Sequence, residues 1–110
     1  MPPFDSPPPF EEGLHVSPYE LFRRLANGER PPMVELRGTG RSLIGATRGE
    51  PGSAFAPGTI LIDRDGLSAT EAARRARAEG TDIRALYGGV ELWDFALDPL
   101  VVGEQRFLSD

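Results

Sequence analysis

Two aspartates, Asp63 and Asp65, follow the apolar run T-I-L-I in the segment T-I-L-I-D-R-D-G-L-S-A, residues 59–69. Carboxylates at positions i and i+2 can share a divalent cation. Free N–H groups where a loop enters a helix attract an anion, and a nearby carboxylate of the same chain can accept them instead. We expect the carboxylates of Asp63 and Asp65 to accept hydrogen bonds from these N–H groups, in place of an external anion. The candidate site comprises the loop residues Asp63, Arg64, Asp65, Gly66, Leu67 and Ser68.

A strand and a helix must position this loop. Residues 59–62 are apolar or β-branched and predict a short buried strand that ends at the first aspartate. Ser68 and Glu71 have the S-x-x-E spacing of a capping box, in which the serine hydroxyl accepts an N–H of the first helical turn. Small residues at helical spacing then predict a helix over 69–79. In open α/β sheets, ligands are usually held where such a loop leaves the carboxyl end of a strand.

The rest of the chain alternates between strand and helix patterns. The expected elements are a strand at 14–16, a helix at 18–27, a strand at 33–36, a long Gly- and Pro-rich loop region at 38–58, a strand at 82–87 and a helix at 90–97. This order is typical of a parallel α/β sheet. Trp93 shares a helix face with Val90 and Leu97, so we expect it to pack in the core.

Composition excludes several classes of function. The formal charge of −5 and the pI near 4.9 argue against nucleic acid or an anionic membrane as partner. All twelve basic residues are arginine, so no lysine can form a Schiff base, and without cysteine there is no thiolate nucleophile or sulfur ligand. His15 is the only histidine. We expect no metal or cofactor and, since no stretch reads as a membrane span or leader, a cytoplasmic location.

The chain is expected to form one domain over residues 14–110, preceded by a Pro-rich tail at 1–13. The tail has five prolines with two phenylalanines among them, a composition that favours extended polyproline II. A length of 110 residues fits a single hydrophobic core.

Three segments resemble the rhodanese-homology family. V-S-P-Y-E-L-F-R-R-L-A-N-G at 16–28 resembles the family's opening strand and helix, and M-V-E-L-R at 33–37 resembles a strand that usually ends in Asp-Val-Arg. Residues 60–93 resemble the active-loop strand, its helix, the next strand and a Gly-Gly turn before a helix that carries tryptophan. The most specific match is L-Y-G-G at 86–89 followed by Trp93.

The resemblance implies a small three-layer α/β domain with a parallel sheet, in which the middle segment at 38–58 is shorter than usual. Family members that transfer sulfur carry cysteine where this chain has Asp63, and an aspartate cannot hold sulfane sulfur. The resemblance therefore implies an inactive domain that acts as a binding or regulatory module, with a protein partner or a second copy of the chain. Arg37 and Trp93 are the possible pocket residues that it suggests.

A second resemblance points to a different chemistry. I-L-I-D-R-D-G at 60–66 is similar to the first motif of the haloacid-dehalogenase superfamily, which implies a Mg²⁺-dependent phosphatase with Asp63 as nucleophile and Asp65 as acid/base. That superfamily needs a longer chain with a later lysine or arginine and an acidic pair, and Leu67 replaces its usual threonine. We therefore retain this interpretation only as an alternative.

Overall fold

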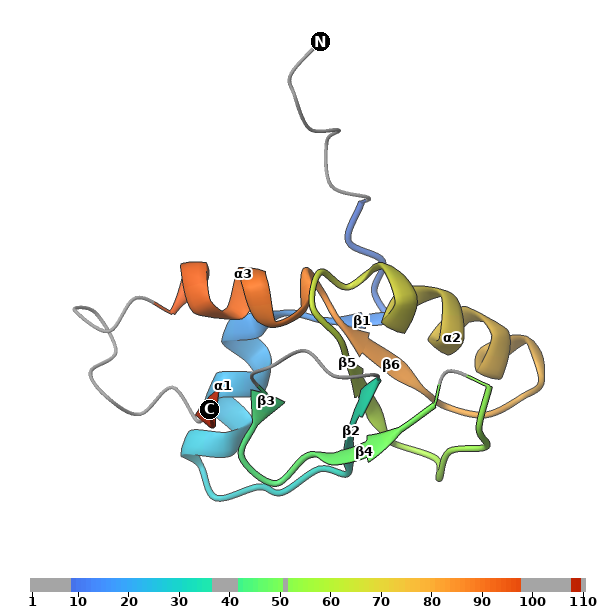
Figure 1. Ribbon diagram of the computed structural model, residues 1–110, viewed down its shortest axis with the longest axis horizontal. Coiled ribbons are helices and arrows are strands. Elements are labelled where there is room, and N and C mark those ends of the chain that lie inside the picture. Colours follow the sequence, from blue (N-terminus) through green and yellow to red (C-terminus); the bar gives the residue numbers. More distant parts are fainter. Residues whose placement is uncertain (1–8, 37–41, 51, 98–107, 110) are drawn as a thin grey trace, which may run out of the picture.

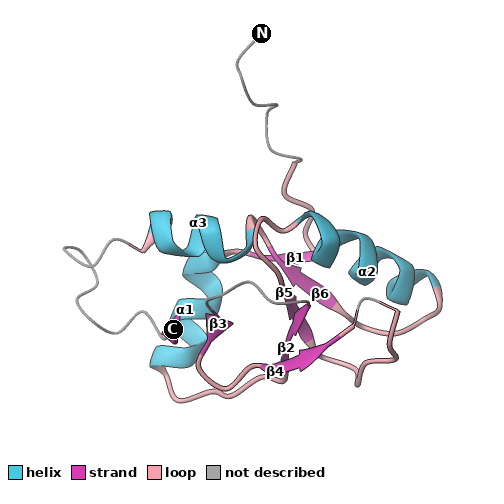
Figure 2. Ribbon diagram, in the orientation of Figure 1, coloured by secondary structure: helices cyan, strands magenta, loops and turns pink. Residues whose placement is uncertain are grey.

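The computed structural model describes residues 9–36, 42–50, 52–97 and 108–109, with strands and helices alternating along the chain (Figures 1 and 2). The elements are β1 (His15–Val16), α1 (Pro18–Ala26), β2 (Met33–Leu36), β3 (Ser42–Leu43), β4 (Thr47–Gly49), β5 (Ile60–Ile62), α2 (Leu67–Ala78), β6 (Arg84–Leu86), α3 (Gly89–Ala96) and β7 (Leu108–Ser109). None of the helices in this part of the chain is long and apolar enough to cross a membrane.

Five strands form one sheet in the order β1-β6-β5-β2-β4, and every neighbouring pair is parallel. The central strand β5 pairs with β2 on one side and with β6 on the other. Because all strands run the same way, their carboxyl ends share one edge of the sheet, where the loop after β5 begins. The sequence prediction of a parallel α/β sheet is confirmed.

Helices cover both faces of this sheet. α1 and α3 pack on one face around Trp93, while α2 packs on the other through its alanines Ala69, Ala72 and Ala73. The side chains of β5 alternate between the two cores: Ile60 and Ile62 face α1 and α3, and Leu61 faces α2. Figure 1 shows α1 and α3 to the left of the strands and α2 to the right. The expected three-layer arrangement is therefore present.

Helix α1 begins at Pro18, where the helix predicted at 18–27 starts. The hydroxyl of Ser17 accepts the N–H of Glu20 at 3.1 Å, and Pro18 occupies the first helical position, where its missing N–H costs nothing. Ser17 and Glu20 have the S-x-x-E spacing of a capping box, but the Glu20 carboxylate lies near Arg84, at 3.8 Å.

The middle segment is not only a loop, which corrects the expectation for residues 38–58. Thr47–Gly49 forms β4, the edge strand beside β2, and Ser42–Leu43 pairs antiparallel with Leu108–Ser109. The three residues T-R-G lack the apolar alternation by which a strand is detected. A Cβ on Gly49 would lie 2.6 Å from Cγ1 of Val34, so glycine allows β4 to approach β2 closely.

Candidate functional site: the loop between β5 and α2

The carboxylate of Asp63 occupies the N-terminal end of α2. Oδ1 accepts the main-chain N–H of Gly66 at 2.6 Å, and Oδ2 accepts that of Ala69 at 3.1 Å. Asp63 is only 5% exposed. Asp65 adds an outer contact, since its Oδ1 accepts the N–H of Leu67 at 3.0 Å. As the sequence predicts, carboxylates of the chain itself accept the N–H groups of the loop, and the donors in the first turn of α2 point at them.

The main chain of the same loop also accepts hydrogen bonds from the first turn of a second helix, α3. The carbonyl oxygen of Asp63 accepts the N–H of Val90 at 2.9 Å, and that of Arg64 accepts the N–H of Glu91 at 3.0 Å. These donors lie in the first turn of α3, which has no partner for them within its own helix. The guanidinium of Arg64 also donates from Nε to the carboxylate of Glu91 at 3.0 Å. The loop therefore caps two helices, one through a side chain and one through its backbone.

Glycines allow this close contact between the loop and α3. Gly66 and Gly89 have φ values of +89° and +65°, a region that side chains disfavour. A Cβ on Gly66 would lie 2.8 Å from the nitrogen of Gly88, and one on Gly89 would lie 2.6 Å from the carbonyl oxygens of Asp63 and Arg64. The Gly-Gly turn is needed because the two backbones touch.

The predicted capping box at Ser68 is wrong. Helix α2 begins at Leu67 after Gly66, no side chain of the N-cap residue caps it, and Ser68 lies inside its first turn. The Asp63 carboxylate takes the N–H of Ala69, so the helix starts earlier than a cap at Ser68 requires. The S-x-x-E spacing is present, but Asp63, a residue outside the helix, supplies the cap.

Burial raises the pKa of the Asp63 carboxyl above its ordinary value, while the N–H groups of Ala69 and Gly66 oppose the rise. The negative charge of Asp65 adds to the increase. The Asp63 carboxylate is therefore buried, and main-chain donors rather than cationic side chains hold it.

The loop geometry does not favour a shared cation. Both oxygens of Asp63 accept N–H groups, which direct its lone pairs toward the helix. Within residues 9–36, 42–50, 52–97 and 108–109, no group of three or more His, Cys, Asp or Glu side chains lies close enough to hold a metal ion. Nothing in this geometry supports the phosphatase interpretation.

Trp93, which the resemblance suggests as a pocket residue, does not extend the loop into an open pocket. Trp93 is completely buried and belongs to the core that α1 and α3 share, with the ring of Phe22 at a centroid distance of 6.4 Å. It is a packing residue, as its position on the helix face indicates. Arg37 lies outside the described residues. Leu67, by contrast, is 55% exposed at the rim of the loop.

His15 supports the loop from a strand that the sequence did not connect with it. Its Nδ1 accepts the N–H of Glu11 at 3.0 Å, and its Nε2 lies 3.0 Å from the hydroxyl of Thr70. That hydroxyl donates to the carbonyl of Gly66 at 2.6 Å, so Nε2–H must be the donor to Thr70. The hydrogen bonds therefore select the neutral imidazole and link residue 11 to the loop. A lone histidine in a sequence gives no signal for such a link.

We expect this histidine to make stability depend on pH. Burial lowers the pKa of His15, the Glu11 carboxylate raises it, and the Arg74 guanidinium lowers it. The folded state then binds fewer protons than the unfolded chain, so the contribution is complete above about pH 6.5 and is lost as pH falls toward the folded pKa. Denaturant titrations across this window are expected to show a decline that His15→Gln lacks. An equal decline in both proteins, or an NMR titration with an unshifted imidazole pKa, would contradict the prediction.

Comparison with known proteins agrees with the architecture. No protein-family model matches the chain, and no curated protein sequence matches it. Six chains of solved structures do match, and three of them superpose on 76%, 71% and 78% of this chain. A rhodanese-related protein from Thermoplasma volcanium has a TM-score of 0.62 at 12% identity, covering 76% of this chain and 92% of its own. This chain has the fold of a rhodanese-like domain.

Two further rhodanese-like structures show the same likeness. The rhodanese-like domain of an Anabaena protein has a TM-score of 0.63 at 17% identity, covering 78% of this chain and 76% of that one. A rhodanese homologue from Thermus thermophilus has a TM-score of 0.56 at 26% identity, covering 71% and 98%. The resemblance carried by the sequence segments is thus confirmed at the level of fold.

Proposed function

We propose that the chain is a catalytically inactive rhodanese-like domain that serves as a binding or regulatory module. The observation that carries the proposal is the Asp63 carboxylate, which occupies the N–H groups of Gly66 and Ala69. By the sequence resemblance, those N–H groups surround the position where sulfur-transferring relatives carry a cysteine thiolate. The chain contains no cysteine at any position.

The chemistry of a carboxylate supports this proposal. Sulfur transfer requires a nucleophile that attacks a sulfane sulfur and keeps it as a persulfide, and a carboxylate does not form a stable bond of this kind. Both Asp63 oxygens also accept hydrogen bonds from the backbone, which lowers their availability for attack. The loop is then a structural joint between α2 and α3, and the domain's function lies in what its surface contacts.

The surface of α1 and α3 offers groups for such contacts. Phe95 of α3 is 84% exposed and Tyr19 of α1 is 59% exposed, and the Tyr19 hydroxyl donates to the carbonyl of Ala96 at the end of α3, at 3.3 Å. Exposed aromatic side chains are common in protein interfaces. We propose a protein partner or a second copy of the chain as the binding partner; the cytoplasmic location expected from the sequence stays a prediction.

An assay with thiosulfate and cyanide tests the inactivity directly. The wild-type protein is expected to give no thiocyanate above background, whereas Asp63→Cys is expected to acquire one sulfur atom from thiosulfate. In that step the thiolate attacks the sulfane sulfur, a persulfide forms and sulfite leaves; cyanide then takes the sulfur as thiocyanate. Mass spectrometry of the variant follows the added sulfur, and Asp63→Ser is the matched control without a thiol.

Turnover by the wild-type protein would overturn the proposal. So would an Asp63→Cys variant that is folded by circular dichroism yet never carries the added sulfur, because the loop would then not correspond to the family's active loop.

A further inference from the structure

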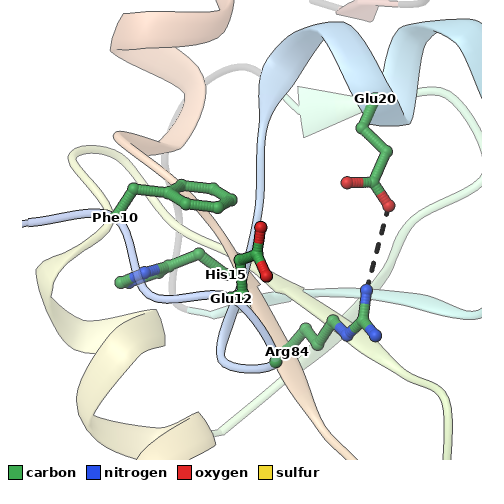
Figure 3. Close-up of a pocket in the computed structure, with 6 residues that line it drawn as sticks. Phe10, Glu12, His15, Glu20 and Arg84 are labelled. Carbon is green, nitrogen blue, oxygen red and sulfur yellow. Dashed lines mark ion pairs between the residues drawn. The ribbon is translucent and has the colours of Figure 1, made fainter.

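A cavity of about 240 Å³ lies away from the loop, between residues 10–13, the first turn of α1 and the start of β6. It is lined by Phe10, Glu12, Gly13, His15, Glu20 and Arg84, and Figure 3 labels all of these side chains except Gly13. The sequence predicts that residues 10–13 belong to the Pro-rich tail, but the Glu11 N–H donates to His15 Nδ1 and the Glu11 carboxylate accepts from Arg74 at 2.7 Å. This part of the tail is therefore a wall of the cavity.

The charges that line the cavity favour a cation. The Glu12 carboxylate makes no hydrogen bond or ion pair with any described residue. Glu20 and Arg84 approach to 3.8 Å, which is beyond hydrogen-bond distance and leaves each half-exposed. His15 is neutral because its Nδ1 accepts an N–H. Two carboxylates thus stand against one guanidinium, and an additional positive charge would be attracted.

An aromatic ring forms the opposite wall. Phe10 is 43% exposed, and its ring makes a T-shaped contact with that of Tyr87, at a centroid distance of 5.4 Å and an interplanar angle of 72°. Its ring also lies 5.7 Å from that of His15. These contacts hold the ring in place and leave part of it open to the cavity. A cation over an aromatic face is stabilised by the ring quadrupole, most often when the cation is a guanidinium.

We propose that this cavity binds a guanidinium group, such as that of an arginine side chain. Its planar charge stacks on Phe10 and donates to the Glu12 carboxylate, and the small volume accommodates one side chain rather than a larger ligand. The cavity is separate from the Asp63 loop. If the cavity does not bind a guanidinium, the proposed inactivity of the loop still stands. If the wild-type protein transfers sulfur, the proposal for the cavity still stands.

NMR titration with methylguanidinium and with Nα-acetyl-arginine-N-methylamide, at constant ionic strength, tests the proposal. Saturating shifts of the single His15 imidazole are expected, with a dissociation constant on the order of 1 mM, which suits a fragment-sized ligand. The bound cation is also expected to lower the pKa of His15 further, because it repels a second positive charge. Tighter binding of the capped arginine identifies a peptide as the source; equal binding identifies the free guanidinium compound.

Three variants distinguish guanidinium binding in this cavity from attraction to the overall negative charge of the protein. Glu12→Gln is expected to weaken binding about two- to fivefold, the range for a partly exposed ion pair. Arg84→Gln is expected to strengthen it, because it removes the only competing cation of the lining. Glu79→Gln, an equal charge change at the exposed end of α2, is expected to leave it unchanged.

The proposal would be overturned if the His15 imidazole showed no saturating shifts at ligand concentrations well above the expected dissociation constant. Equal affinities in wild type and Glu12→Gln would also overturn it, since that substitution alters an exposed side chain without disturbing the core.

Discussion

Replacing Asp63 with alanine is expected to destabilise the protein by about 2–3 kcal/mol at neutral pH and to make its stability respond to sulfate. The substitution removes both acceptors of the Gly66 and Ala69 N–H groups, which are buried at the start of α2. Part of the loss is offset, because the variant no longer buries the charge whose desolvation raises the pKa of Asp63. Chemical denaturation at pH 7 measures the difference.

Sulfate is expected to restore part of the lost stability in Asp63→Ala. The freed N–H groups and the positive end of the α2 dipole form an anion site once the carboxylate is gone. A ligand that binds only the folded state stabilises it by RT ln(1 + [L]/Kd), so the gain grows with the logarithm of the ligand concentration above the dissociation constant. Because sulfate strengthens folding of most proteins, the relevant quantity is the gain in thermal midpoint of the variant minus that of the wild type, with chloride at equal ionic strength as reference.

Asp65→Ala is the matched control for this experiment. Asp65 belongs to the same loop, but it is exposed and, among the residues that the structure describes, it accepts only the N–H of Leu67, at 3.0 Å. Its removal is expected to cost at most about 1 kcal/mol and to create no additional response to sulfate. An Asp63→Ala variant that matches the wild type in stability and in sulfate response would show that the carboxylate does not fill the site.

The layout of the fold was accessible from sequence because most of its elements are marked by local signals. Ser17 and Pro18 mark the start of α1, Gly28 follows its end with φ of +90°, and the run at 59–62 contains β5. Alternation of strand and helix then limits the topology to a parallel sheet. These signals depend on residues within a few positions of one another.

The features that sequence did not reveal depend on distant partners. β4 has no apolar alternation of its own and exists through its pairing with β2. Thr70 reads as an ordinary helical residue, yet it joins His15, which is 55 positions away, to Gly66. The hydrogen bonds to the Asp63 carboxylate were predictable because the donors lie only three and six residues ahead of it. The cap predicted at Ser68 was wrong because the S-x-x-E spacing is a local pattern, whereas the carboxylate that caps the helix lies outside that pattern.

Replacing Gly89 with alanine is expected to be the most damaging single-methyl change at the site, with a loss of more than about 3 kcal/mol or failure to fold. The added Cβ would lie 2.6 Å from the carbonyl oxygens of Asp63 and Arg64, and the neighbouring atoms are backbone, which cannot rotate away. A φ of +65° adds the strain of the left-handed region. Soluble yield and thermal unfolding give the readout.

Gly28→Ala separates the clash from the backbone strain. Gly28 has a φ of +90°, and a Cβ there would meet nothing within 4 Å. Its substitution is expected to cost about 1–2 kcal/mol, the price of a left-handed alanine alone. Losses of equal size in the two variants would show that the contact between the loop and α3 contributes nothing.

The two substitutions at the loop are expected to differ in their response to sulfate. Asp63→Ala removes a side chain and leaves the main-chain N–H groups in place, so an anion can replace the carboxylate. Gly89→Ala displaces the main chain of residues 63 and 64, which the α3 donors of Val90 and Glu91 otherwise hold. Sulfate is therefore expected to give Gly89→Ala no gain beyond that of the wild type, which would identify the Gly-Gly contact as the feature that shapes the loop and Asp63 as the group that fills it.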